Sequence, residues 1–325
     1  MAVNLTQKNE TTARGLFAIE KVALGYTLFT SALILVLYAR MDRPFMMLME
    51  RLIILCMTLS LMEVYRRFPC RLSALVRICF QLGLLSYWYP DTYEFNRVFP
   101  NLDHVFAAAE QWLFGMQPAL VFHEALPQKW FSEALHLGYL SYYPLIAFIV
   151  LWYFWKRFRD FERVAFIMEF SFIFYYLLFI FIPVAGPQFY FPAIGLQNAL
   201  QGVFPHIGDY FNTHQQLAPS TEYYEGFFYN LVEGSQAIGE RPTAAFPSSH
   251  VGISTIIMII AARTHRKMFS FLLPFYVLLC CATVYIQAHY VIDALAGFVS
   301  AFFIYGLACL CFDCWFVRPD PGRPD

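Results

Sequence analysis

The run "MFSFLLPFYVLLCCATVYIQAHYVIDALAGFVSAFFIYGLACLCF" at residues 268–312 contains one charged side chain, Asp293. A helix needs roughly 20 mostly apolar residues to cross a bilayer, so this run is about twice as long as one span. It therefore predicts a hairpin of two membrane helices, with its turn near residues 287–291. The turn brings His289 to the membrane edge and leaves Asp293 one helical turn further in.

The rest of the chain has the composition of a membrane protein. Of its 325 residues, 59% are hydrophobic and 14% are charged, against about 25% charged in a typical soluble domain. The formal net charge of −1 argues against a nucleic-acid partner. The apolar runs predict an all-α, polytopic integral membrane bundle of about eight transmembrane helices. We place these helices at approximately residues 22–39, 45–65, 72–89, 132–155, 164–185, 248–262, 268–287 and 291–312.

Basic residues cluster in three of the connections between these predicted spans. The positive-inside rule assigns basic connections to the cytoplasm, and with eight spans all three fall on that side. We therefore expect cytoplasmic termini and two long outer loops, 90–131 and 186–247, with an interfacial helix around 104–116. The three basic clusters are Arg66, Arg67 and Arg71; Lys156, Arg157, Arg159 and Arg163; and Arg263, Arg266 and Lys267.

His289 and Asp293 are four residues apart, a spacing that puts both on one face of a helix. A carboxylate so placed can accept a hydrogen bond from one imidazole nitrogen of the histidine. That bond fixes the tautomer and leaves the other nitrogen free to attack or to bind. An ionisable residue inside a membrane helix is a functional candidate by default, because burying its charge there is costly.

The segment "FPSSH" at residues 246–250 enters the preceding helix from the same outer side. Ser248 or Ser249 is a suitable N-cap, and the first N–H groups of the helix point outward. Together with the helix dipole these groups form an anion site suited to phosphate. His250 lies in the first turn beside that site, so the topology predicts His250, His289 and Asp293 at one membrane face.

The segments "PSSH" and "HYVID" resemble the second and third signature blocks of the type 2 phosphatidic acid phosphatase superfamily, P-S-G-H and S-R-x5-H-x3-D. The resemblance is closest to the branch with inositol phosphorylceramide synthase and sphingomyelin synthase. It implies that His289 is the nucleophile that forms a phosphohistidine, that Asp293 orients it, and that His250 protonates the leaving alcohol. It also implies a six-helix catalytic core within residues 72–312, after a tail and two accessory helices in 1–71 and before a tail at 313–325.

The chain departs from the superfamily pattern at its basic residues. Thr283 stands where the phosphatases carry an arginine, six residues before the nucleophile, and Gly234 stands where their first block would have a lysine. Arg241, in the pair Arg241–Pro242, is a candidate phosphate clamp. A phosphate monoester carries nearly two charges near neutral pH and favours several cations, whereas a diester carries one. The shortage of cations therefore favours transfer of a phospho-headgroup over monoester hydrolysis.

Further candidate substrate contacts lie in the outer half of the span at 132–155. His136 and Tyr139 share a face there, and interfacial packing is the competing interpretation. "PVAGPQFYFP" at 183–192 ends a span at the same face and can act as a helix stop or as part of a headgroup pocket.

Four functions compete at this point. The leading hypothesis is a lipid phosphotransferase that moves a headgroup such as phosphoinositol from a phospholipid to a lipid alcohol such as ceramide, without a cofactor or metal. The nearest alternative is a lipid phosphate phosphatase with water as the acceptor. A serine protease using Ser249 with His289 lacks the usual Gly-x-Ser-x-Gly context. A transporter with a His and Asp ion site is the non-enzymatic alternative.

Overall fold

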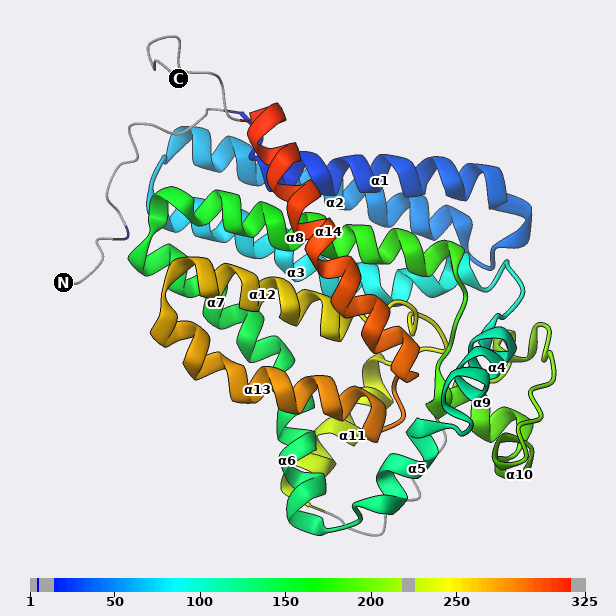
Figure 1. Cartoon of the computed structure of the whole chain (residues 1–325). Helices are drawn as coiled ribbons and strands as arrows, with labels where there is room; N and C mark the ends of the chain where they lie inside the picture. The colour runs from blue at the N-terminus through cyan, green and yellow to red at the C-terminus, as the bar shows by residue number, and fades with distance from the viewer. Residues whose placement is uncertain (1–4, 6–14, 218–225, 317–325) are drawn as a thin grey trace. The chain divides into compact units, whose positions relative to one another are not determined.

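The structure of the protein is a computed structural model that describes residues 5, 15–217 and 226–316 (Figure 1). All regular secondary structure in these residues is helical, which confirms the predicted all-α class. The α-helices are α1 (Ala18–Leu37), α2 (Pro44–Arg67), α3 (Arg71–Asn96), α4 (Asp103–Phe114), α5 (Pro118–Ala125), α6 (Lys129–Leu140), α7 (Tyr142–Lys156), α8 (Phe158–Phe181), α9 (Pro187–Ile194), α10 (Leu196–Leu200), α11 (Phe227–Gly239), α12 (Ser249–Thr264), α13 (Arg266–Tyr285) and α14 (Val291–Phe316); the short 3-10 helices are η1 (Tyr38–Arg40) and η2 (Tyr210–Asn212).

Five of the described helices are long and apolar enough to cross a membrane. They cover Ala18–Arg40, Pro44–Arg67, Phe158–Phe181, Arg266–Tyr285 and Val291–Cys314. The pair α6 and α7, bent by 42°, is a sixth if it forms one broken span. The two other predicted spans, 72–89 and 248–262, do form helices, but α3 falls outside the five candidates and α12 has only 16 residues. Several apolar helices of this length fit an integral membrane protein.

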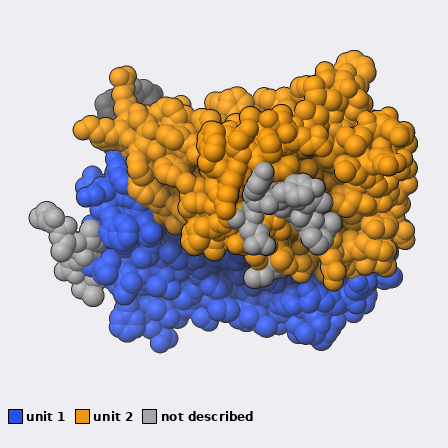
Figure 2. Space-filling view, turned by 90° about the horizontal axis from the view of Figure 1, so that it is seen from below, with its two compact units in different colours: residues 1–87, 150–173, 303–325 blue, residues 88–149, 174–302 orange. Residues whose placement is uncertain are grey.

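The chain divides into two compact units, coloured separately in Figure 2. The first unit comprises residues 1–87, 150–173 and 303–325, of which part is described. Within it Arg77 of α3 is 1% exposed and donates from Nε to Oε1 of Glu20 of α1 at 2.6 Å. The guanidinium also lies 3.7 Å from the ring centroid of Phe17. Partners for a buried cation explain how an arginine fits into a run predicted as a span.

The second unit, residues 88–149 and 174–302, contains the predicted hairpin. Helix α13 ends at Tyr285 and α14 begins at Val291, so the predicted turn is confirmed. Helices α12 and α13 lie side by side, and α6 packs against both α13 and α11 (Figure 1). Helix α14 meets the start of α12 at Gly297, where an added Cβ would lie 2.3 Å from the carbonyl oxygen of Ser248. Small residues permit this close approach of two backbones.

Helix α4 confirms the helix predicted around 104–116, but its buried face is acidic. Asp103 and Glu110 are fully buried, seven residues apart on one side of the helix. Trp112 on the other side is 83% exposed. Since a buried carboxyl needs partners, the two acids indicate that α4 supports another part of the second unit.

Candidate active site

His289 lies in the connection between α13 and α14, outside both helices, and is 4% exposed. Its Nδ1 lies 2.8 Å from the carbonyl oxygen of Ala245. Because a carbonyl only accepts, Nδ1 carries the hydrogen and Nε2 carries the free lone pair. The backbone N–H of His289 donates to the carbonyl of Thr283 at 3.0 Å, which fixes the turn. The ring is therefore held in the tautomer that a nitrogen nucleophile requires.

The position of Asp293 corrects the expected hydrogen bond. Its Oδ2 is 3.7 Å from Nδ1 of His289 and instead accepts from the backbone N–H of Tyr290 at 2.9 Å. The tautomer of His289 is set by the Ala245 carbonyl, which comes from a segment far away in the sequence. Asp293 is fully buried, and its Oδ2 lies near the imidazole without a direct hydrogen bond to it.

His250 faces Nε2 of His289 from the first turn of α12, with its Nδ1 at 3.5 Å. One side of its ring stacks on Tyr139 of α6 at a centroid distance of 4.8 Å and an angle of 24°. Tyr142 contacts the same ring at 4.4 Å. Ser248 is the N-cap of α12, and its Oγ accepts from the N–H of Val251 at 3.3 Å. The predicted N-cap is confirmed, and the two signature histidines are adjacent.

The starts of α12 and α14 are joined directly. The N–H of Ser248 donates to the backbone carbonyl of Asp293 at 3.0 Å. With the contact at Gly297, this bond fixes the register between the helix that holds His250 and the turn that holds His289. The two histidines, 39 positions apart in the sequence, are therefore brought together.

Asp103 ties a third segment to the turn. Its carboxylate accepts from the N–H groups of Ala185 and Gly186 at 2.7 and 2.8 Å, and from the hydroxyl of Tyr290 at 3.1 Å. Gly186 has φ +93, and a Cβ there would lie 2.7 Å from the carbonyl oxygen of Ala288. Only glycine fits this conformation and this approach. The "PVAGPQFYFP" segment thus packs against the turn that holds His289.

Glu110 supports the first turn of α14. Its Oε1 accepts from the N–H of Val291 at 2.5 Å and of Ile292 at 3.3 Å. Burial raises the pKa of Glu110 to about 7, and the charge of Asp293 adds to this. Burial likewise raises the pKa of Asp103 to about 6, although the hydrogen bonds that its carboxylate accepts lower the pKa in part. Our sequence reasoning missed both residues, although two acids seven apart in an amphipathic stretch were a usable signal.

A small pocket of about 10 Å³, roughly the size of one water, opens beside the two imidazoles. Glu240 lies in its wall, and the hydroxyl of Tyr89 donates to Glu240 Oε2 at 2.9 Å. Among the described residues that line the pocket there is no lysine or arginine. They are Tyr89, Tyr139, Ala185, Gln188, Glu240, Thr243, Ala244, Ala245, Ser249, His250, Ala288 and His289.

Two of the predicted substrate contacts lie away from this pocket. Arg241 lines a larger, adjoining cavity of about 980 Å³, which shares Gln188 and Glu240 with the pocket, and donates from Nη1 to the carbonyl of Glu240 at 2.9 Å. His136 bonds through Nδ1 to the carbonyl of Ser132 at 2.7 Å, and its ring meets Tyr229 edge-on. Tyr139 and Ser249 do line the pocket.

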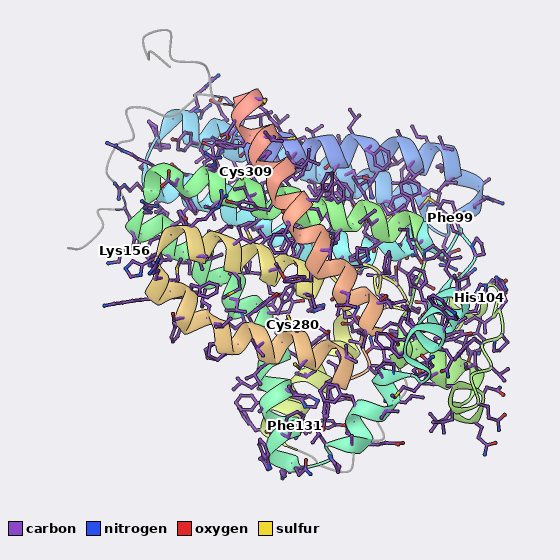
Figure 3. The ribbon with its side chains drawn as sticks, viewed as in Figure 1. Phe99, His104, Phe131, Lys156, Cys280 and Cys309 are labelled. Atoms are coloured by element: carbon purple, nitrogen blue, oxygen red, sulfur yellow. The ribbon has the colours of Figure 1, made fainter. Side chains whose placement is uncertain are left out.

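Thr283, at the position of the superfamily's arginine, is also turned away from the pocket. It is fully buried, and its hydroxyl donates to the carbonyl of Cys280, labelled in Figure 3, at 2.8 Å. Its backbone carbonyl accepts a hydrogen bond from the N–H of His289 and so helps to fix the turn that holds this histidine. Because this side chain is neutral and bonds within its own helix, the position has no charge that could bind a phosphate.

The electrostatics favour the neutral form of His289. Burial lowers the pKa of His289 to about 4, although the bond to Ala245 and the charge of Glu240 oppose that shift. The imidazole is therefore neutral at neutral pH, with Nε2 available. Burial raises the pKa of Glu240, against the hydrogen bond from Tyr89 and the nearby His289. In the described part of the chain, no group of three His, Cys, Asp or Glu side chains is placed to hold a metal ion.

Two adjacent imidazoles beside a helix N-terminus in a helical membrane bundle suit phosphoryl chemistry, because the helix N–H groups can bind phosphate and an imidazole can act as a nucleophile. A sequence profile of the PAP2 superfamily matches residues 104–307, more than half of the 325-residue chain, and the chain belongs to this superfamily. Membership indicates phosphatase or phosphotransferase activity on lipid phosphates. No curated protein and no solved structure matches the chain.

The contact at Gly297 yields a prediction for Gly297→Ala. The new Cβ would meet backbone atoms of Ser248 and Gly252. Backbone atoms cannot move aside as the end of a flexible side chain can, so α14 has to shift. We expect turnover of a lipid phosphate substrate to fall by about 10²-fold, because a misplacement of about 1 Å has that effect on catalysis.

Gly306→Ala on the same helix is the matched control, since nothing lies within 4 Å of its added Cβ. Initial rates and thermal unfolding of both purified variants provide the measurement. Equal rates for the two variants would show that the α12–α14 contact does not set the distance between the histidines.

Proposed function

We propose that this chain is a membrane phosphotransferase that moves the phospho-headgroup of a phospholipid, such as phosphoinositol, to a lipid alcohol such as ceramide. One observation carries the proposal: Nε2 of His289 is left free by the Ala245 bond and lies 3.5 Å from Nδ1 of His250. This arrangement suits a nucleophile with an adjacent acid and base.

In the first step Nε2 of His289 attacks phosphorus, and the bond from phosphorus to the oxygen of the leaving diacylglycerol breaks. His250, as the imidazolium ion with a hydrogen on both ring nitrogens, gives its Nδ1 proton to that oxygen and becomes the neutral imidazole. The positive charge of the phosphohistidine is balanced by the buried Asp293, 3.7 Å from Nδ1 of His289. The N–H groups at the start of α12 supply donors for the phosphoryl oxygens.

In the second step the hydroxyl of the acceptor lipid gives its proton to His250 and attacks phosphorus. The phosphorus–nitrogen bond breaks, and the neutral imidazole of His289 is restored. Water in place of the lipid alcohol would give hydrolysis by the same steps, so the acceptor distinguishes the transferase from a phosphatase.

The absence of basic side chains from the described lining supports a diester substrate. A monoester near neutral pH has nearly two negative charges to neutralise, and a diester has one. Arg97, a further candidate cation, lies 3.8 Å from Glu94 and near the ring of Tyr93. Lys129 is exposed at the start of α6.

The test is an assay of purified protein in lipid nanodiscs containing ceramide, with phosphatidylinositol, phosphatidylcholine or phosphatidic acid as the donor. We expect mass spectrometry to detect a new phosphosphingolipid and diacylglycerol in equal amounts from one of the diesters. Inorganic phosphate from phosphatidic acid, with no transfer product from either diester, would identify a phosphatase instead.

A further inference from the structure

We propose that Glu240 binds the substrate by donating a hydrogen bond from its carboxyl O–H to a phosphoryl oxygen. It thereby fills the place that a basic side chain would otherwise take. This inference rests on the proposed function and adds to it the group that holds the phosphate.

The first argument is location. Glu240 shares the pocket wall with His250 and His289, so a phosphoryl group bound to Nε2 of His289 would enter a pocket that Glu240 lines. Glu240 lies nine positions before the start of α12. The segment between them also presents the Ala245 carbonyl. The chain that sets the tautomer of the nucleophile therefore also brings the carboxyl to it.

The second argument is orientation. The hydroxyl of Tyr89 on α3 donates to Oε2 of Glu240 at 2.9 Å, which fixes the carboxyl group against the wall. A carboxyl that accepts at one oxygen can still donate from the other when it is protonated. A neutral acid placed in this way can act as a hydrogen-bond donor to a developing oxyanion.

The third argument is charge. A carboxylate beside a phosphate would repel it, and no lysine or arginine lies among the described lining residues to offset this. Burial raises the pKa of Glu240, which favours the neutral form. Other titratable or charged groups face Glu240 in the pocket, in the adjoining cavity or through its electrostatic field: Tyr89, Tyr139, Tyr143, Tyr210, His214, Glu233, Arg241, His250 and His289.

The pH dependence follows from these charges. Below the raised pKa of Glu240 the carboxyl is neutral and holds the phosphate, so KM is low. As pH rises through that pKa the carboxylate forms and KM rises. The effect of His289 falls at the acidic end of the pH range. There kcat/KM falls as pH drops toward about 4 and the imidazole of the free enzyme becomes protonated.

The experiment compares Glu240→Gln and Glu240→Ala in the nanodisc assay across pH, using whichever phospholipid donor the wild type turns over. The amide of glutamine still donates a hydrogen bond but does not ionise. We expect Glu240→Gln to keep kcat/KM within about threefold at low pH and to lose the alkaline rise in KM. We expect Glu240→Ala to raise KM by about 10- to 100-fold, the usual loss for a hydrogen bond to a charged group.

Glu233→Gln on α11 is the matched control, because Glu233 lines the larger cavity and not the pocket of the histidines. A loss of kcat in Glu240→Gln with KM unchanged would instead make the carboxylate a base for the acceptor alcohol. Wild-type KM in Glu240→Ala would remove the residue from binding altogether. Either result overturns the inference while wild-type transfer still stands; a wild type that makes no product fails the proposed function instead.

Discussion

His289→Ala is expected to lower turnover by about 10³-fold or more and to abolish the covalent intermediate. The variant loses Nε2, the atom proposed to attack phosphorus. No other imidazole in the described lining of the pocket has its Nδ1 bonded to the Ala245 carbonyl so that Nε2 carries no hydrogen. Rapid acid-free quenching with a donor labelled in its phosphate is expected to trap label on the wild-type protein and none on the variant.

His265→Ala is the control for this measurement. His265 is exposed at the turn between α12 and α13, where its ring accepts from the N–H of Lys267. We expect it to keep both turnover and the labelled intermediate. Residual turnover of His289→Ala within tenfold of the wild type, in folded protein, would contradict a phosphohistidine mechanism.

His250→Ala is expected to reduce turnover of a natural phospholipid by about 10²- to 10⁴-fold, the range for a general acid or base. The reason is its position: Nδ1 lies 3.5 Å from Nε2 of His289, beside the place where the proposed mechanism puts the phosphoryl group. The stacked ring of Tyr139 holds the imidazole in that place.

The loss should depend on the leaving group. A nitrophenyl phosphodiester releases an anion that needs no proton, so formation of the labelled intermediate in His250→Ala should recover with this donor. His289→Ala should remain inactive with both donors. Equal losses of His250→Ala with both donors would show that His250 holds the site together rather than supplying a proton.

Much of the fold could be predicted from composition and local pattern. A run of 45 residues at 268–312 with one charge permits little besides a membrane hairpin, and the turn between Tyr285 and Val291 falls where the length of the run predicts it. The number of spans could not be settled in the same way. In α3 the buried Arg77 pairs with Glu20, a partner supplied by another helix, and hydropathy alone carries no information on such pairs.

The candidate site was predictable in part for the same reason. His250, His289 and Asp293 follow from short motifs and from the N-cap at Ser248, because these features depend on neighbours within a helical turn. The hydrogen-bond partner of His289 does not. Asp293 was expected in that role from its spacing of four, whereas the Ala245 carbonyl, 44 residues away, has it.

The sequence by itself determined that this protein is a helical membrane bundle with two histidines and an aspartate at helix starts, since apolar run length and residue spacing are local properties. Only the tertiary structure decided what surrounds them. Asp103 and Glu110 brace the turn from α4, and Glu240 enters the pocket while Arg241 faces another cavity. Which side chains become neighbours depends on how closely two backbones can approach, as at Gly297 and Ser248. That distance depends on packing between segments far apart along the chain.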